Sequence, residues 1–222
     1  KSSKIMLAKN ISPHTQTLPL LLNVSNTVLH VTPEEFDSLC LDNPDLRLEL
    51  TKDQELIVMS PTGGESGERN LELTFQVAAW NKKNKLGRAF DSSTGYDFTN
   101  IDGGKMSPDV SWIDSSRLDG IDITGFIPIV PDFVIELRED ETGEVSSPAR
   151  YVRSATDRLN TLQSKMLEYQ RLGVKLGLLI NPQDNQVEVY RLDQQTEIFD
   201  SPTAIDCQPL MPGFNLDLTE IL

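Results

Sequence analysis

Cysteine and histidine are scarce in this chain of 222 residues, and long hydrophobic runs are missing. The two cysteines, Cys40 and Cys207, stand far apart and match no disulfide or metal-binding spacing, so we assign them no chemistry and expect a reducing compartment. His14 and His30 both lie in or near the N-terminal stretch, which leaves a His-based catalytic triad little to work with. The apolar stretch 18–22 is too short to cross a bilayer and lacks a signal-peptide cleavage pattern, so we expect a cytoplasmic protein with no membrane partner.

Basic residues are outnumbered, because 20 Lys and Arg residues stand against 34 Asp and Glu residues and the formal net charge is −14. This acidic excess argues against a protein that coats nucleic acid through a basic surface. It does not exclude a nuclease, because a metal cluster with a local Lys or Arg groove holds a phosphate while the remaining surface stays acidic. The charge balance predicts weak nucleic-acid affinity without metal.

The apolar content of 38% is sufficient for one good-sized core. Residues 1–27 have no hydrophobic period and predict a loose N-terminal tail, whereas residues 28–222 predict a single domain. Thr32 to Glu35 combine a cap, a proline at the first helical position and an acid three residues after the cap. A short helix through Leu39 should begin there.

Two further helices are expected. The Gly-rich stretch 61–67 breaks the chain before a helix on which Leu71, Phe75 and Ala78 recur at four and three residues, with Gly87 as its stop. Ser154 to Leu172 predict an amphipathic helix ended by Gly173. Its apolar positions are Leu159, Leu162, Met166 and Tyr169.

Strands fill the intervals between these helices. A hairpin is expected over 46–50 and 56–59, and a closing hairpin over 178–180 and 187–190. The other strand candidates are 89–90, 96–98, 107–113 and 131–137. This order predicts an α/β fold with a mixed β-sheet flanked by a few helices and additional β-hairpins.

Two acids stand inside the last two of those apolar runs, Asp109 in 107–113 and Glu136 in 131–137. A buried carboxylate is costly unless it is paired, hydrogen-bonded or bound to metal. Carboxylate oxygens are the hard ligands that Mg²⁺ prefers, so two such acids on neighbouring strands suggest a divalent-cation site. The structural alternative stays open, since an Asp after Pro often caps a turn and a Glu at a strand end is often solvated.

Three more charged residues are candidates for the same site. Arg138, two residues after Glu136, holds phosphate but does not act as a base. Lys165 lies at the edge of its helix's apolar face and reaches inward, or else it is a snorkelling surface lysine. By its spacing to Leu71, Glu68 turns toward the packed side of its helix; the alternative is an acid that complements the helix dipole. Asp132, near the start of the same run as Glu136, has two readings: an acid of the strand or a turn residue after Pro131.

These residues and several sequence blocks resemble the Uma-two family of restriction-endonuclease domains, within the nuclease superfamily named for its Pro-Asp, acid, any residue, Lys motif. The resemblance runs from about Val31 to Leu222. The blocks that carry it are 46–50, 61–67, 90–95, 107–113, 131–138, 162–169, 181–182 and 210–214.

The resemblance implies a restriction-endonuclease-like core in which Asp109 and Glu136 bind Mg²⁺, with Mn²⁺ as a substitute. Arg138 occupies the position of the superfamily's lysine, and the resemblance implies that Lys165 serves instead. Glu68 would correspond to the acid that many superfamily members carry on their first core helix. DNA is the implied substrate, and a homodimer is expected because cutting both strands of a duplex needs two sites or two events.

One departure from the family pattern is the polar segment 139–153, read as an inserted loop between two implied catalytic residues. The sequence therefore supports two readings from different classes. The first is a metal-dependent endodeoxyribonuclease, and the second is a catalytically inactive module that keeps the nuclease fold for binding or assembly. A glycosidase built on Asp109 and Glu136 is disfavoured by the resemblance.

Overall fold

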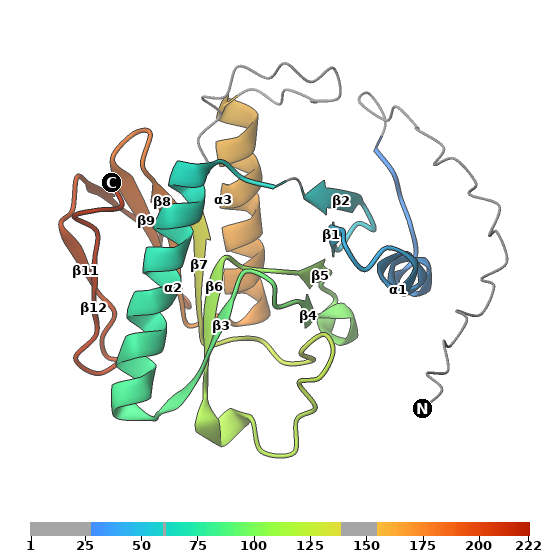
Figure 1. Cartoon of the computed structure of the whole chain (residues 1–222), viewed down its shortest axis with the longest axis horizontal. Coiled ribbons are helices and arrows are strands. Elements are labelled where there is room, and N and C mark those ends of the chain that lie inside the picture. The colour runs from blue at the N-terminus through green and yellow to red at the C-terminus, as the bar shows by residue number, and fades with distance from the viewer. Residues whose placement is uncertain (1–27, 60, 139–154) are drawn as a thin grey trace, which may run out of the picture.

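The computed structural model describes residues 28–59, 61–138 and 155–222 (Figure 1). The expected tail at 1–27 and the expected inserted loop at 139–153 both lie outside the described residues. Within the described part, no helix is long and apolar enough to cross a membrane.

A six-stranded mixed sheet forms the centre of the fold, in the order β10-β9-β8-β7-β6-β3. Only β7 and β8 among these neighbours are parallel. The strands are β3 (Gly87–Asp91), β6 (Val110–Asp114), β7 (Phe133–Leu137), β8 (Leu176–Asn181), β9 (Gln186–Arg191) and β10 (Glu197–Asp200). Every residue of β7 and β8 is buried, as their nearly continuous apolar sequences predict for central strands.

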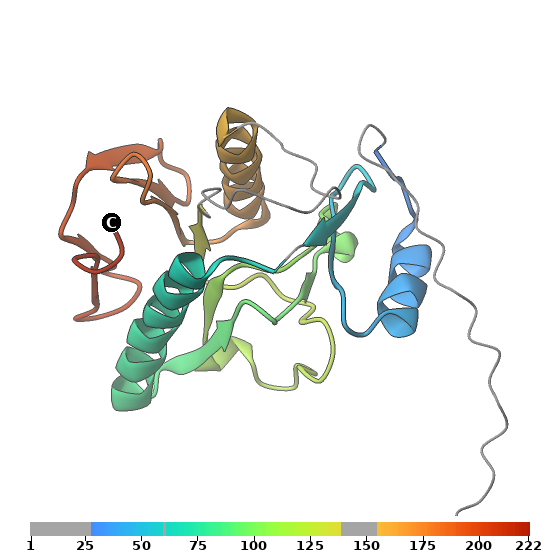
Figure 2. The same ribbon diagram turned by 45° about the horizontal axis from the view of Figure 1, so that its top comes forward.

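Two long helices cover opposite faces of this sheet, α2 (Gly64–Asn84) and α3 (Ala155–Leu172). Phe133, Ile135 and Leu137 pack with the buried face of α2, whereas Val134 packs with Met166 and Tyr169 of α3. Figure 2 shows the two helices on either side of the central strands. Glu136 shares its face with Val134, because side chains alternate along a strand, so it points toward α3.

A smaller four-stranded sheet, ordered β2-β1-β5-β4, lies beside the central one (Figures 1 and 2). Its strands are β1 (Arg47–Leu50), β2 (Leu56–Met59), β4 (Tyr96–Asp97) and β5 (Lys105–Met106). Leu50 pairs with Lys105, and a Cβ added at Gly104 would lie 2.0 Å from the Leu50 carbonyl oxygen. Glycine at that position therefore lets β1 approach the rest of the molecule closely.

Helix α1 (Pro33–Asp42) packs on the small sheet through Phe36, which contacts Leu48 and Leu50 in a separate apolar cluster. The expected capping box is present: Thr32 Oγ1 accepts the Glu35 N–H and Glu35 Oε2 accepts the Thr32 N–H. The helix continues three residues beyond the predicted end at Leu39. The ion pair between Asp37 and Lys105, at 2.5 Å, ties α1 to β5.

The C-terminal segment completes the core on the α2 side. Strands β11 (Ala204–Asp206) and β12 (Asn215–Asp217) form a two-stranded sheet that the sequence analysis did not predict. Buried residues of this segment join the α2 cluster, among them Phe214, Leu216 and Leu218. The Trp80 ring lies between Trp112 and Phe214, with centroid separations of 5.5 and 5.6 Å.

The face predicted for α2 is wrong. Leu71 and Phe75 are 70% and 61% exposed, and the buried positions are Leu73, Val77 and Trp80. Both sets recur at four and three residues and are offset by two positions, so spacing alone does not choose between them. The contact of Trp80 with Trp112 and Phe214 determines which face of α2 is buried.

The boundaries of α2 also differ from the prediction. The helix begins at Gly64, inside the expected break, and ends at Asn84 before Lys85, which has a left-handed conformation. Gly87, the predicted stop, is the first residue of β3.

Candidate active site

Glu136 is almost fully buried near the end of β7, where its side chain faces α3. Its Oε1 lies 2.9 Å from Lys165 Nζ and accepts a hydrogen bond from the Tyr169 hydroxyl at 3.2 Å. Burial raises the pKa of Glu136 to about 8; Lys165 opposes this shift, and the nearby acids Asp109 and Glu49 add to it.

Asp109 is half-buried and immediately precedes β6, the antiparallel neighbour of β7. Its Oδ2 accepts the backbone N–H of Leu137 at 2.8 Å, which ties the two strand ends together. Its Oδ1 accepts the side-chain amide of Asn70 at 3.1 Å. Burial raises the pKa of Asp109, against the opposing effects of the Leu137 N–H and of Lys165. The two acids singled out from the sequence therefore share one site.

Lys165 reaches inward from α3, the first of the two alternatives for its position, and its side chain is only 12% exposed. Besides Glu136, its Nζ donates to Glu49 Oε1 at 2.9 Å and to the Ser107 carbonyl oxygen at 3.1 Å. Burial disfavours the charged form, but the carboxylates of Glu136 and Glu49 outweigh it and raise the pKa of Lys165. The ammonium group is therefore held charged among acids.

Glu49 belongs to this cluster although the sequence analysis did not name it as a site residue. It is 4% exposed on β1, and its Oε1 also accepts the backbone N–H of Ser107 at 2.7 Å. Strict alternation in 46–50 suggests a polar side chain facing solvent. The close approach of β1 to the Ser107 segment instead buries both faces of the strand. The available signal was one acid within a short apolar strand, the same pattern that marked Asp109 and Glu136.

Glu68 lies on the exposed face of α2, because the true buried face is offset from the predicted one. Asn70, two residues later, supplies the α2 contact to the site through its hydrogen bond to Asp109. Asn70 stands three and seven residues before Leu73 and Val77, so the correct phase of the helix would have identified it.

Arg138 is buried at the end of β7 next to the β8–β9 turn. Its Nη1 donates to Asn181 Oδ1 at 3.0 Å and to Asp184 Oδ2 at 2.8 Å. The Arg138 guanidinium therefore contacts the β8–β9 turn, whereas the ammonium group of Lys165 pairs with Glu136. The structure thus brings Asp109, Glu136 and Lys165 together, and directs Arg138 and Glu68 to other surroundings.

The sequence matches the family model described as "Uma2: Putative restriction endonuclease" over residues 33–145 and 152–219, more than half of the chain. The chain belongs to this family. No curated protein matches significantly. A similar solved structure is that of a "putative nuclease belonging to DUF820 from Anabaena variabilis ATCC 29413", with a TM-score of 0.59, 24% sequence identity, and coverage of 78% of this chain and 88% of that chain. This likeness confirms the expected nuclease-like α/β fold.

The donor set of this Uma2 domain fits Mg²⁺. Among the described residues no group of three His, Cys, Asp or Glu side chains is arranged to hold a metal ion. Mg²⁺ does not require one, because it is usually bound by one or two carboxylates and completes its shell with water and substrate phosphate. Asp109 and Glu136 supply two such carboxylates on adjoining strand ends.

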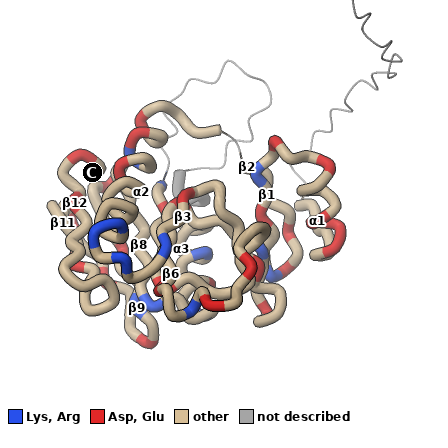
Figure 3. Tube along the Cα trace, turned by 60° about the horizontal axis from the view of Figure 1, so that its bottom comes forward, with Lys and Arg blue, Asp and Glu red and all other residues tan. Residues whose placement is uncertain are grey.

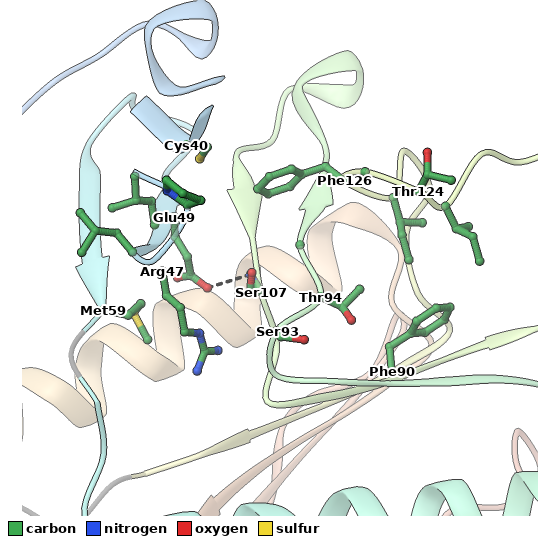
Figure 4. Close-up of a pocket in the computed structure, with 17 residues that line it drawn as sticks. Cys40, Arg47, Glu49, Met59, Phe90, Ser93, Thr94, Ser107, Thr124 and Phe126 are labelled. Carbon is green, nitrogen blue, oxygen red and sulfur yellow. Dashed lines mark hydrogen bonds between the residues drawn. The ribbon is translucent and has the colours of Figure 1, made fainter. Parts of the chain in front are cut away.

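A pocket of about 530 Å³ opens beside the cluster (Figure 4). Glu49 and Ser107, which contact Lys165, are also part of its lining. Its remaining walls come from β1, the end of β2, the β3–β4 turn and the loop around Phe126. Of the acid cluster, Glu49 alone is part of the pocket lining, and Arg47 is the basic residue on the same wall.

Proposed function

We propose that this domain is a Mg²⁺-dependent endonuclease that hydrolyses DNA phosphodiester bonds. One observation carries the proposal: Asp109, Glu136 and Lys165, far apart in sequence, meet at the ends of two adjoining strands with Lys165 Nζ 2.9 Å from Glu136. Membership of the Uma2 family supports it. The dense packing behind these groups holds them in fixed positions.

Each residue has a separable role in this proposal. Asp109 and Glu136 would hold the cation, which would polarise the phosphoryl oxygen and lower the pKa of an attacking water. Asn70 and the Leu137 N–H orient Asp109, and the Tyr169 hydroxyl orients Glu136. Lys165 positions the water and stabilises the negative charge that grows on the phosphate. Glu49 holds Lys165 from the opposite side.

The acidic composition explains why the domain would need the cation to bind its substrate. Figure 3 shows Asp and Glu spread widely over the molecule, including α1. Three acids, Glu49, Asp109 and Glu136, share the site with the ammonium group of Lys165, so a phosphate entering without metal meets mainly acidic groups. A bound divalent cation reverses that balance.

The test is incubation of purified protein with supercoiled and single-stranded DNA in the presence of Mg²⁺ or Mn²⁺. The wild type should cleave, and Asp109→Ala and Lys165→Ala should each reduce the rate by about a hundredfold or more. Glu220→Gln, which removes an exposed acid near the C-terminus, should leave the rate unchanged. No cleavage, together with no metal-linked stabilisation, would instead assign the domain to the binding or assembly class.

A further inference from the structure

The pocket beside the acid cluster is not used by the mechanism above. In Figure 4, Arg47 and Met59 lie on one side, Phe90 and Phe126 on the other, and Ser93, Thr94 and Ser107 between them. Its volume of about 530 Å³ falls within the range of small-molecule sites, roughly 300–1,000 Å³. The lining combines aromatic rings with hydroxyl groups, which suits a flat heterocycle that both stacks and hydrogen-bonds.

The pocket is directly connected to the catalytic groups. Glu49 Oε1 accepts hydrogen bonds from Ser107 N–H at 2.7 Å and from Lys165 Nζ at 2.9 Å, and both Glu49 and Ser107 line the pocket. A ligand that contacts Glu49 in the pocket is therefore separated from Lys165 only by the Glu49 side chain. A polynucleotide with one base in the pocket would therefore run past Glu49, the residue that joins the pocket wall to Lys165.

Arg47 supplies a cation at the boundary between pocket and cluster. It is exposed on β1, lines the pocket and donates a hydrogen bond to the carbonyl oxygen of Ser92 across it. Its charge also reaches the cluster, because it is among the groups that lower the pKa of Asp109 against the dominant effect of burial. A phosphate between Arg47 and the metal-binding acids would contact both.

We propose that this pocket receives one unpaired nucleobase of the DNA strand being cut, with Arg47 on the adjacent phosphate. The proposal rests on the proposed nuclease function and specifies its substrate as a strand unpaired at the cleavage site. A base inside a duplex is stacked and paired, so it reaches such a pocket only after extrusion. Single strands instead offer free base faces to aromatic side chains and free edges to hydroxyl groups. One copy of the chain is sufficient to cut such a substrate.

The first experiment measures binding of fluorescein-labelled 12-mers by anisotropy, with Ca²⁺ in place of Mg²⁺ to limit cleavage. The single strand should bind at least about tenfold more tightly than the duplex of the same sequence. A 12-mer of abasic deoxyribose phosphates should lose a similar factor, because it keeps the phosphates and lacks the bases. Equal binding of the abasic strand, or tighter binding of the duplex or of the matching RNA, would overturn the proposal.

Two variants locate the effect, each with a matched control. Thr94→Trp fills the pocket and should abolish the preference for the base-containing strand, whereas Thr203→Trp, at an exposed position in the C-terminal segment, should preserve it. Arg47→Ala should weaken binding of all strands and reduce the slope of log affinity against log salt by about 0.7. Arg88→Ala, which removes an exposed arginine on β3, should leave that slope unchanged.

The two proposals fail in different ways. Base-dependent binding that Thr94→Trp abolishes, without Mg²⁺-dependent cleavage of any DNA, would refute the nuclease and keep the pocket as a single-strand site. Cleavage that Asp109→Ala abolishes and Thr94→Trp leaves unchanged on single strands would keep the nuclease and refute the pocket.

Discussion

The two ends of β7 each carry a buried acid, and their surroundings differ in charge. At the start of the strand, Asp132 is fully buried with Arg117 and Lys175 both 2.8 Å from its Oδ1, and its Oδ2 accepts the Asp114 N–H at 2.9 Å. Arg117 and Lys175 there face Asp132 and the more exposed Asp114, so two cations stand against two acids. At the far end, Lys165 pairs with Glu49 and Glu136, and Asp109 lies close enough to affect the pKa of Glu136.

The comparison shows that burial of an acid within a strand does not distinguish a structural residue from a functional one. Asp132 is as deeply buried as Glu136, and two cations lie within 2.8 Å of its Oδ1. The acids at the other end outnumber Lys165, and the raised pKa of Glu136 indicates that ionising all of them is costly unless a further cation binds. Charge balance, rather than burial, therefore identifies the end suited to a metal and a phosphate.

The largest expected effect comes from removing Lys165, which pairs directly with two acids at this end of β7. Lys165→Met leaves Glu49 and Glu136 without their cation and should lower the free energy of unfolding by about 3–5 kcal/mol, measured by urea denaturation at pH 8.5. Adding Glu136→Gln should restore part of the loss, whereas Lys83→Met on the exposed side of α2 should cost little. A loss below about 1 kcal/mol would show that the acids do not depend on Lys165.

Removing the acid at each end compares the two surroundings directly. Asp132→Ala leaves the buried Asp114 N–H without an acceptor and should cost about 2–3 kcal/mol, a fall in Tm of roughly 5–10 °C by thermal unfolding. Asp109→Ala should leave Tm roughly unchanged or raise it, because its two lost hydrogen bonds are offset by relief of repulsion with Glu136. Equal falls in both variants would make Asp109 structural as well.

Mg²⁺ should stabilise the acid-rich end alone. At a free concentration about a hundred times the dissociation constant, the ion should add about 2.7 kcal/mol to the free energy of unfolding, seen as a rise in Tm. The gain should persist in Asp132→Ala and disappear in Asp109→Ala. A gain that survives Asp109→Ala would place the bound ion elsewhere.

The smallest expected effect is a change in pH dependence. The pKa of Glu136 is about 8 in the folded protein against an ordinary 4.5, so between these values the native state holds a proton that the unfolded chain releases. The free energy of unfolding should therefore fall as pH rises from about 4.5 to 8, and this contribution should level off above 8. Denaturation between pH 5 and 9 should show a weaker fall in Glu136→Gln and an unchanged one in Glu220→Gln. An unchanged profile in Glu136→Gln would contradict the raised pKa.

Local patterns predicted that Asp109 and Glu136 lie within apolar segments of neighbouring strands, because those segments are short and nearly free of other charges. Asp109 and Glu136 were found from their apolar runs, and Lys165 from its place at the edge of a helical face with one apolar stripe. Helix α2 has two apolar stripes with identical spacing, so the phase was misjudged, Glu68 was turned inward and Asn70 was missed. Glu49 was missed because the close approach of β1 to Ser107 is a contact between segments 58 residues apart.

The sequence by itself determined the order of the main strands and helices, the family, and the acids that burial makes costly, because these depend on spacing along one segment. Only the tertiary structure decided which stripe of α2 is buried, that Arg138 contacts the β8–β9 turn, and that two cations lie beside Asp132. Those outcomes depend on which distant segments share the space around β7. That choice is made by packing of the whole core, in which Trp80, Trp112 and Phe214 meet from three separate parts of the chain.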